Sequence, residues 1–266
     1  MFRSNFHTHT IYCDGKNTPG EMAERAAELG FTALGFSGHA YTDFDLSYCM
    51  TPEKTAKYIA DVQSVKEQYA GRLNIYCGAE LDYYSPALPF EYDYTIGSVH
   101  YLHLGDDYAE VDHNAETQLN AAKKHFGGDY MKYAEKYFET VGDVAEKLRP
   151  DFIGHFDLVS KFNEGDCMFD SSDRRYVNAW KTAAERLCNA GIPFEINTGA
   201  IARGARKTPY PSPEIADFID SRGGFFIITS DCHNRDYLTC AFDFVAEHYG
   251  KYNIVDFEEI LRPSAL

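Results

Sequence analysis

Positive charge is scarce in this sequence. Its 266 residues carry 25 Lys and Arg against 41 Asp and Glu, which gives a formal net charge of −16 at pH 7. Proteins that bind nucleic acids or anionic membranes need a positive surface that neutralises phosphate groups. The acidic balance therefore argues against a nucleic-acid polymer or a membrane as partner. It does not exclude a small phosphorylated molecule, because bound cations or a few basic side chains can reverse the potential inside one cleft.

Long apolar runs and paired cysteines are missing as well. No run of about 18 apolar residues occurs, and the N-terminal sequence MFRSNFHTHT lacks the apolar segment of a signal peptide. The seven cysteines are an odd number with no CxxC pair, which is typical of reduced thiols and not of a disulfide framework. These absences predict a cytoplasmic protein.

Glycine-rich phosphate-binding loops are also absent. Neither GxGxxG nor GxxxxGKS/T follows the first strand-like segment, which disfavours the open sheets that bind nucleotides. What the sequence contains is an alternation of strand-like and amphipathic segments. Strands are predicted at residues 2–9, 32–39, 74–81, 93–100, 151–158, 192–199 and 225–232. Helices are predicted at residues 18–30, 52–70, 128–148, 171–191, 211–223 and 235–250.

This alternation implies parallel strands joined by right-handed crossovers, in an open sheet or a closed barrel. We predict one α/β domain over residues 1–266, with a polar insertion at about residues 101–128. Within the insertion, the polar segment of residues 105–114 is expected to be an inserted loop and helix over one end of the barrel.

Residue types that bind metal ions stand at the end of every predicted strand. They are His7, His9, His39, Glu80, His100, His155, Glu195, Asn197, Asp231 and His233. In parallel α/β barrels the carboxyl ends of the strands meet at one concave face, so these side chains are expected to converge. Because side chains alternate faces along a strand, three pairs should each point to one side: His7 with His9, His155 with Asp157, and Asp231 with His233.

The number of donors predicts more than one ion. Six of these histidines together with Asp14, Glu80 and Asp231 offer nine nitrogen or oxygen donors, whereas one Zn²⁺ uses about four. Two or three ions that share a carboxylate are therefore expected, with Glu80 as the bridge because a carboxylate has two oxygens to divide. A single histidine at a strand end is more often an ordinary polar residue, but six at corresponding positions favour a metal cluster.

These residues carry a family resemblance. The motifs HTHT (7–10), CDG (13–15), SGH (37–39), GAELD (78–82), GSVH (97–100), GHFDL (154–158), EINTGA (195–200) and SDCH (230–233) resemble those of the polymerase-and-histidinol-phosphatase (PHP) superfamily of metallohydrolases. The histidinol-phosphate phosphatase branch is the most similar. The resemblance implies a distorted (β/α)₇ barrel, similar to a TIM barrel, that holds three divalent ions of Zn, Mn or Fe.

The resemblance also implies a ligand set for each ion. The first ion would take His7, His9, Glu80 and Asp231, the second Glu80, His100 and His155, and the third Asp14, His39 and His233. Asp14 stands where some branches have His, which moves the preference of the third ion toward Mn²⁺. Glu80 and Asp231 are the expected catalytic residues, Glu80 as the bridge and Asp231 as the acceptor of the proton of the attacking water.

Two loops are expected to bind the phosphate group of the substrate. The loop after the sixth predicted strand carries Arg203 close to Asn197, and the loop after the fifth carries Lys161. Arg203, Lys161 and Asn197 are the expected substrate-binding residues. Arg203 can bind two phosphate oxygens with paired hydrogen bonds, and Lys161 can add a point charge. Arg206 and Lys207 are expected to be solvated.

Three functions are weighed. The resemblance implies a phosphomonoesterase that converts L-histidinol phosphate to L-histidinol and phosphate in histidine biosynthesis. The alternatives are a phosphoesterase of the same fold acting on nucleotides or other small phosphoesters, and a non-catalytic metal-stabilised scaffold. The oligomeric state, the proton donor and any lid function of residues 105–114 are left open.

Overall fold

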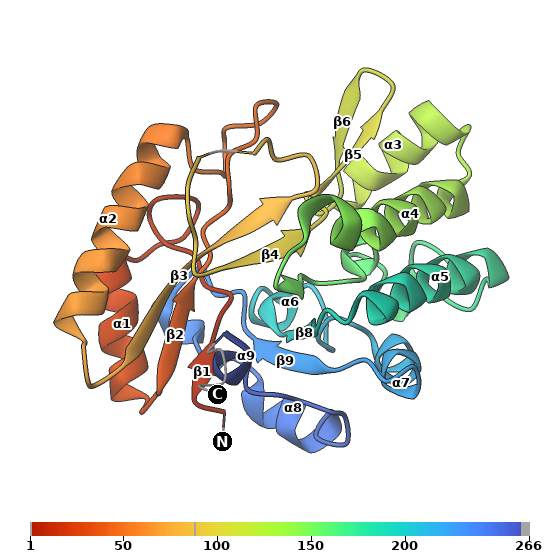
Figure 1. Cartoon of the computed structure of the whole chain (residues 1–266). Coiled ribbons are helices and arrows are strands. Elements are labelled where there is room, and N and C mark those ends of the chain that lie inside the picture. Colours follow the sequence, from red (N-terminus) through yellow and green to blue (C-terminus); the bar gives the residue numbers. More distant parts are fainter. Residues whose placement is uncertain (1, 88, 262–266) are drawn as a thin grey trace.

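The computed structural model describes residues 2–87 and 89–261. Seven parallel strands form a nearly closed barrel (Figure 1). The order of the strands around the barrel is β1 (Ser4–Asn5), β2 (Ala33–Phe36), β3 (Asn74–Asp82), β4 (Tyr94–Ser98), β7 (Phe152–Ile153), β8 (Phe194–Asn197) and β9 (Phe226–Thr229). The chain just after β1 and just after β9 closes the ring: the N–H of His9 donates to the Cys232 carbonyl at 2.9 Å. The predicted distorted (β/α)₇ barrel is confirmed.

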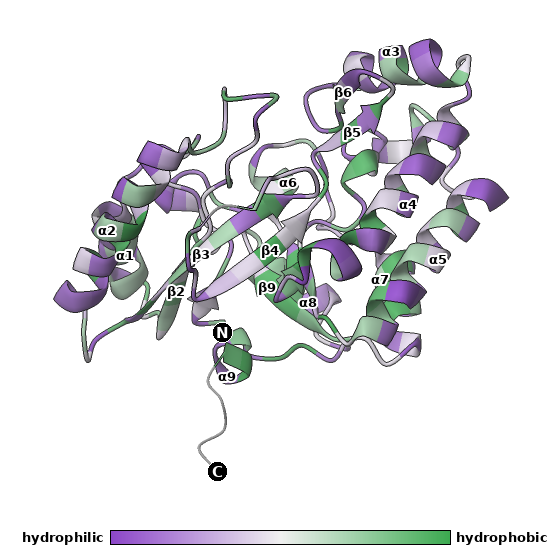
Figure 2. Cartoon of the chain, turned by 45° about the horizontal axis from the view of Figure 1, so that its top comes forward, coloured by the Kyte–Doolittle hydropathy of each residue, from purple (hydrophilic) through white to green (hydrophobic). Residues whose placement is uncertain are grey.

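Helices cover the outside of the barrel. They are α1 (Pro19–Glu28), α2 (Pro52–Gln68), α4 (Tyr130–Leu148), α5 (Arg174–Ala190), α7 (Pro213–Ser221) and α8 (Phe242–His248). The short α6 (Gly199–Ala202) follows β8, and α9 (Phe257–Leu261) packs at the amino end of the barrel. Figure 2 shows an apolar β9 and hydrophilic outer sides on helices such as α5. Each helix therefore buries one apolar stripe against the strands.

Local signals explain where the helices begin and end. Thr18 caps α1 in a capping box with Glu21, and Pro19 follows as the first helical residue. One expectation is wrong in detail. The segment predicted as one helix at residues 235–250 consists of a 3-10 helix at Arg235–Tyr237 and the separate α8. Ala241, between them, has φ of 56°, a left-handed conformation that interrupts the helix.

Aromatic side chains fill the amino-terminal half of the barrel. Phe6, Phe152 and Phe257 pack around Tyr94, with ring centroids 4.9–6.0 Å apart. A Cβ on Gly35 or on Gly78 would collide with the Tyr94 ring. This packed floor leaves the carboxyl ends of the strands for polar groups.

The insertion between β4 and α4 is more ordered than predicted. Residues 105–114, expected to be an inserted loop and helix, contain a turn and the strand β6 (Asp107–Glu110), which pairs with β5 (Tyr101–Leu104) in an antiparallel hairpin. The helix α3 (Ala115–Phe126) follows the hairpin. Gly105, with φ of 66°, takes the first position of the two-residue turn, where only a residue that tolerates positive φ fits. The lid role of this segment stays an open question.

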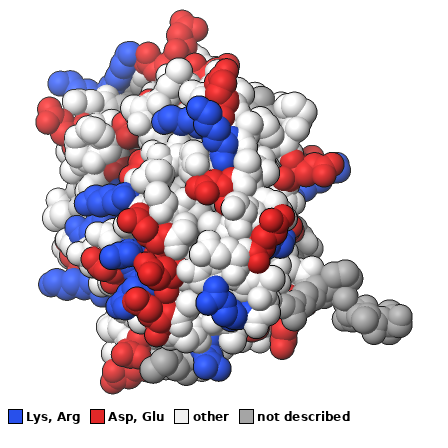
Figure 3. All heavy atoms as spheres, turned by 90° about the vertical axis from the view of Figure 1, so that its left-hand side faces the viewer, with Lys and Arg blue, Asp and Glu red and all other residues white. Residues whose placement is uncertain are grey.

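Charges of both signs are interspersed on the face of α1 and α2, without a continuous basic tract there (Figure 3). Such a face offers no track for a nucleic-acid strand. Within the described residues, no helix is long and apolar enough to cross a bilayer.

Candidate metal centre

The side chains predicted to bind metal meet at the carboxyl end of the barrel. His7 and His9 follow β1, His39 follows β2, and Glu80 lies inside β3. The others come from the far side of the ring: His100 follows β4, His155 follows β7, and Asp231 and His233 follow β9. Six of the seven strands thus contribute at least one side chain to one cluster, as barrel geometry requires.

Glu80 lies at the centre of the cluster and is fully buried. Its Oε2 faces one group of rings, 3.1 Å from His7 Nε2 and 3.0 Å from His39 Nδ1. Its Oε1 faces another, 2.9 Å from His155 Nε2 and 3.3 Å from His100 Nε2. The two oxygens of one carboxylate therefore point to two separate sets of donors.

A second carboxylate joins the first group. Asp231 Oδ1 lies 3.2 Å from His9 Nε2 and 3.6 Å from His7 Nε2. Asp231 has φ of 46°, so the chain bends into the left-handed region directly after β9. That bend, and not strand alternation, brings Asp231 and His233 to the same side.

A third group surrounds Asp14. Its two oxygens lie 3.0 Å from His233 Nε2, 3.6 Å from His9 Nδ1 and 3.7 Å from His39 Nε2. The rings of His9 and His233 stack with centroids 4.0 Å apart. His39 also contacts Glu80, so its two ring nitrogens lie between the Asp14 group and the Glu80 group.

The unsatisfied atoms of the cluster fit divalent cations. His7 Nε2, His9 Nε2 and Glu80 Oε2 are buried and lack a hydrogen-bond partner among the described residues. These three residues form one of the three donor groups whose ligand atoms lie within 4.8 Å of one another. Buried polar atoms are nearly always paired, and imidazole nitrogen with carboxylate oxygen is the donor set that Zn²⁺, Mn²⁺ and Fe²⁺ accept. The residues present therefore fit bound metal.

The electrostatics of the cluster are those of tightly packed carboxylates and imidazoles. Burial works against the charged form of Glu80, but His7, His39 and His100 outweigh it and hold the Glu80 pKa well below its usual range. The pKa of Asp231 is likewise held low, by Arg203 and His7 against burial. Both groups are thus carboxylates, the form that binds cations.

The pKa values of His7 and His9 are shifted in opposite directions. Burial lowers the pKa of His7, but Glu195, Glu80 and Asp231 outweigh it and raise that pKa well above its usual value. Burial, reinforced by the neighbouring rings of His233 and His39, lowers the pKa of His9 to about 3. His9 is therefore neutral, with a free nitrogen lone pair, at any pH near 7.

Several residues behind the cluster hold its side chains in position through hydrogen bonds. Most of these residues were not predicted from the sequence. Glu195 on β8 is fully buried and accepts from His7 Nδ1 at 2.8 Å and from the Thr229 hydroxyl at 2.7 Å. Asp82 accepts from the backbone N–H of His100, and Ser98 donates to Glu80 Oε1. A signal existed for Asp82, which stands two residues after Glu80 on one strand and hence on the same face.

Asn197 has a different place from the one predicted. It is fully buried behind the cluster, where its amide donates to Glu195 at 2.7 Å and accepts from the Gly199 N–H at 2.8 Å. Both ends of the amide are thus occupied inside the protein. Asn197 orients Glu195 and does not face the cleft where a substrate would enter.

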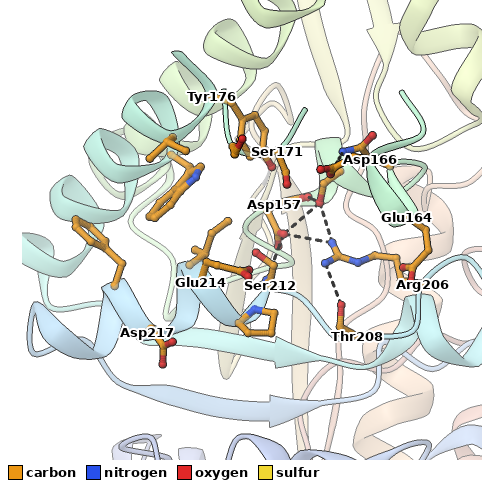
Figure 4. Close-up of a pocket in the computed structure, with 18 of the residues that line it drawn as sticks. Asp157, Glu164, Asp166, Ser171, Tyr176, Arg206, Thr208, Ser212, Glu214 and Asp217 are labelled. Carbon is orange, nitrogen blue, oxygen red and sulfur yellow. Dashed lines mark hydrogen bonds and ion pairs between the residues drawn. The ribbon is translucent and has the colours of Figure 1, made fainter. Parts of the chain in front are cut away.

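Asp157 does not join His155 in the cluster. The strand β7 ends at Ile153, and the chain turns through a 3-10 helix at Leu158–Ser160, so the alternation assumed for this pair does not apply. Asp157 Oδ2 instead lies 3.2 Å from Arg206 (Figure 4). The prediction that Arg206 is solvated is wrong, because its side chain is 7% exposed and also donates to the Ser160 hydroxyl at 2.8 Å.

Of the two basic residues expected to meet phosphate, Arg203 contacts the cluster and Lys161 contacts Asp112 in the insertion. Arg203 donates to Asp231 Oδ2 at 2.8 Å and lies 3.3 Å from His233 Nδ1, with 38% of its side chain exposed. Lys161 bonds to the carbonyl and the carboxylate of Asp112, at 2.8 and 3.1 Å. Lys161 thereby ties the insertion to the loop after β7, and a phosphate contact of Lys161 stays a prediction.

Comparison with known protein families gives one match. The family described as the PHP domain matches residues 5–199. That range includes the donors on five of the six contributing strands and ends before Asp231 and His233.

Two curated relatives agree with this match. The chain is 30% identical over 239 residues to a probable histidinol-phosphatase of Deinococcus radiodurans, with 85% of each chain covered. It is 28% identical over 234 residues to the histidinol-phosphatase of Bacillus subtilis, with 78% of this chain and 83% of the relative covered.

Two solved structures share the fold. A structure from Listeria monocytogenes described as a histidinol phosphatase has a TM-score of 0.76 at 21% identity and covers 91% of this chain and 99% of its own. The histidinol phosphate phosphatase of Lactococcus lactis, crystallised with Zn, L-histidinol and phosphate, has a TM-score of 0.69 at 17% identity and covers 95% of each chain.

Proposed function

The chain belongs to the PHP domain family, and from that membership we propose that it is a metal-dependent phosphomonoesterase that hydrolyses L-histidinol phosphate to L-histidinol and phosphate. The observation that carries the proposal is the divided carboxylate of Glu80, whose two oxygens face His7 and His39 on one side and His100 and His155 on the other. A carboxylate placed in this way is suited to bridge two cations that act together on one phosphate.

The cofactors in this proposal are three divalent cations of Zn, Mn or Fe. His7, His9, Glu80 and Asp231 would hold the first, Glu80, His100 and His155 the second, and Asp14, His39 and His233 the third. The contacts of 2.9–3.7 Å among these donor atoms support the three sets. When bound, such cations lower the pKa of coordinated water and draw charge from the phosphate oxygens.

The residues of the chain have separate tasks. Glu195 and Asn197 hold the His7 ring in position through its Nδ1, so that Nε2 is presented to the cleft. Asp231 would accept the proton of the attacking water; its Oδ1 lies beside His7 and His9, and its Oδ2 accepts from Arg203. Arg203, partly exposed at the rim, binds phosphate oxygens with its remaining N–H groups.

A panel of phosphate esters compared by kcat/KM tests this function. L-Histidinol phosphate should exceed nucleoside monophosphates and p-nitrophenyl phosphate by at least about 100-fold, because a site that pairs with substrate hydrogen-bonding groups rejects analogues without them. If a nucleotide is hydrolysed as well as L-histidinol phosphate or better, the second reading, a phosphoesterase of nucleotides and other small phosphoesters, replaces the first. Absence of turnover with every ester in metal-loaded protein would favour the scaffold.

A further inference from the structure

A separate pocket of about 780 Å³ lies outside the barrel (Figure 4). It is bounded by α5, α7 and the loop that follows β7, and Asp157 and Arg206 form its inner wall. None of the residues proposed above as metal ligands lines it. The pocket is therefore distinct from the cleft at the carboxyl ends of the strands.

One side of the pocket is aromatic. Trp180 on α5 and Phe218 on α7 meet edge to face, with centroids 5.3 Å apart. The ammonium group of Lys181, an exposed side chain, lies 5.5 Å from each ring centroid. These rings thus already attract a cation, and the cation is on a flexible side chain that a ligand can displace.

The other side of the pocket is acidic. Asp217 pairs with Lys251 at 2.6 Å, and Asp157 pairs with Arg206. The lining has three further carboxylates, those of Glu164, Asp166 and Glu214. Lys181 is the one further cation among the lining residues. The field in the pocket therefore favours a positive ligand.

A buried acceptor adds an independent observation. Asp157 is 1% exposed, and although its Oδ2 accepts from Arg206, its Oδ1 has no hydrogen-bond partner within the described parts of the chain. Buried carboxylate oxygens without partners are costly, and a ligand that donates a hydrogen bond would remove that cost.

We propose that this pocket is a second ligand site, for a small organic cation in which a short aliphatic chain joins an amine to an aromatic ring. The ligand's ring displaces Lys181 from Trp180 and Phe218, and its amine lies toward the carboxylates of the lining. L-Histidinol belongs to this class, whereas its phosphate ester brings negative charge toward Glu164, Asp166 and Glu214. Only this last step rests on the proposed function: under it, the site binds the product, L-histidinol, and rejects the substrate, L-histidinol phosphate.

The fluorescence of Trp180 reports occupancy directly, because Trp180 is the single tryptophan of the chain. Metal-loaded enzyme is titrated with phenethylamine, 2-phenylethanol and phenylacetate, which share a ring and differ in charge, and then with L-histidinol. The amine should give a saturable change at a concentration at least about tenfold below that of the neutral alcohol, and phenylacetate should bind more weakly still. No saturable change, or an equal response to the three ring compounds, would overturn the site.

Two substitutions with opposite expected signs separate a ligand site from a structural effect. Glu214→Gln removes an attracting charge and should weaken amine binding several-fold, whereas Lys181→Gln removes the competing cation and should strengthen it. Glu247→Gln, an exposed carboxylate on α8 outside the pocket, should leave binding unchanged. Shifts of the same sign in the first two variants would contradict the site. If phenethylamine binds and L-histidinol does not, the product assignment is wrong, and the hydrolysis panel decides the proposed function separately.

Discussion

Glu80 concentrates the chemistry of the site in one side chain. It is the residue of the cluster whose two oxygens face different donor groups, and its Oε1 is further fixed by the Ser98 hydroxyl at 2.7 Å. Asp14, by contrast, is about one third exposed and serves a single group. The two carboxylates therefore differ in the number of cations that depend on them.

Glu80→Gln should cost more activity than Asp14→Asn. Loss of a charged bridge should remove about 4 kcal/mol of transition-state stabilisation, or roughly 10³-fold in kcat/KM, whereas loss of an outlying ligand should cost roughly 10- to 100-fold. Steady-state kinetics on both variants, with circular dichroism to establish folding, measure the difference. Wild-type kcat/KM in folded Glu80→Gln would assign the carboxylate a structural role.

Arg203 is the basic residue best placed for phosphate. Arg203→Ala should lower kcat/KM by roughly 10²–10³-fold, about 3–4 kcal/mol, and Arg203→Lys should restore only part, because an ammonium cannot form the paired hydrogen bonds of a guanidinium. Metal content, measured on the same samples, should stay constant. Wild-type kinetics in Arg203→Ala would remove Arg203 from the site, and a parallel loss of metal would assign it to holding Asp231.

At the scale of the secondary-structure element, β8 supports the site without supplying a ligand. Glu195 and Asn197 stand two residues apart on this four-residue strand, and both side chains are fully buried behind His7. The hydrogen bond from His7 Nδ1 to Glu195 fixes which ring nitrogen faces the cleft.

Glu195→Gln should therefore weaken metal binding by roughly 10- to 100-fold while the barrel stays folded. Metal affinity is measured by competition with a chelator of known affinity. Glu258→Gln is the matched control, because Glu258 is also a buried carboxylate but bonds to Asn74 and Tyr76 at the amino end of β3. Equal metal affinity in wild type and Glu195→Gln would contradict an orienting role.

The features of the fold that depend on local periodicity could be predicted from the sequence. The seven strands and most of the covering helices follow from composition and alternation, and the cluster follows because parallel strands end at one face. Asp157 and Arg206 escaped prediction for a physical reason. The strand β7 has only two residues, so the pattern read beyond it was no longer a strand, and the two partners lie 49 positions apart. Contacts of that kind are set by loop packing, which no local pattern encodes.

At the scale of the whole molecule, the proposed cations join six of seven strands at their carboxyl ends, while the aromatic floor around Tyr94 holds the other end. The described chain alone leaves buried nitrogen and oxygen atoms of the cluster without partners. Metal binding should therefore be coupled to stability.

Thermal unfolding should respond to metal. Ions bound only by the native state add RT ln(1 + [L]/Kd), about 4 kcal/mol at 1,000 times Kd, which corresponds to a rise in Tm of roughly 8–16 °C for a chain of this size. Calorimetry with and without chelator measures the shift. A Tm indifferent to chelator would contradict a cluster that ties the strands together.

The most direct test of the account follows metal content and hydrolysis of L-histidinol phosphate in one sample. Elemental analysis and kcat/KM are determined on the protein as purified, after exhaustive chelation, and after the return of Mn²⁺, Zn²⁺ or Fe²⁺. Activity should disappear with the metal and return with it, because bound cations would lower the pKa of the attacking water, whereas Asp231 only accepts its proton. Full turnover by protein shown to be free of metal would contradict it.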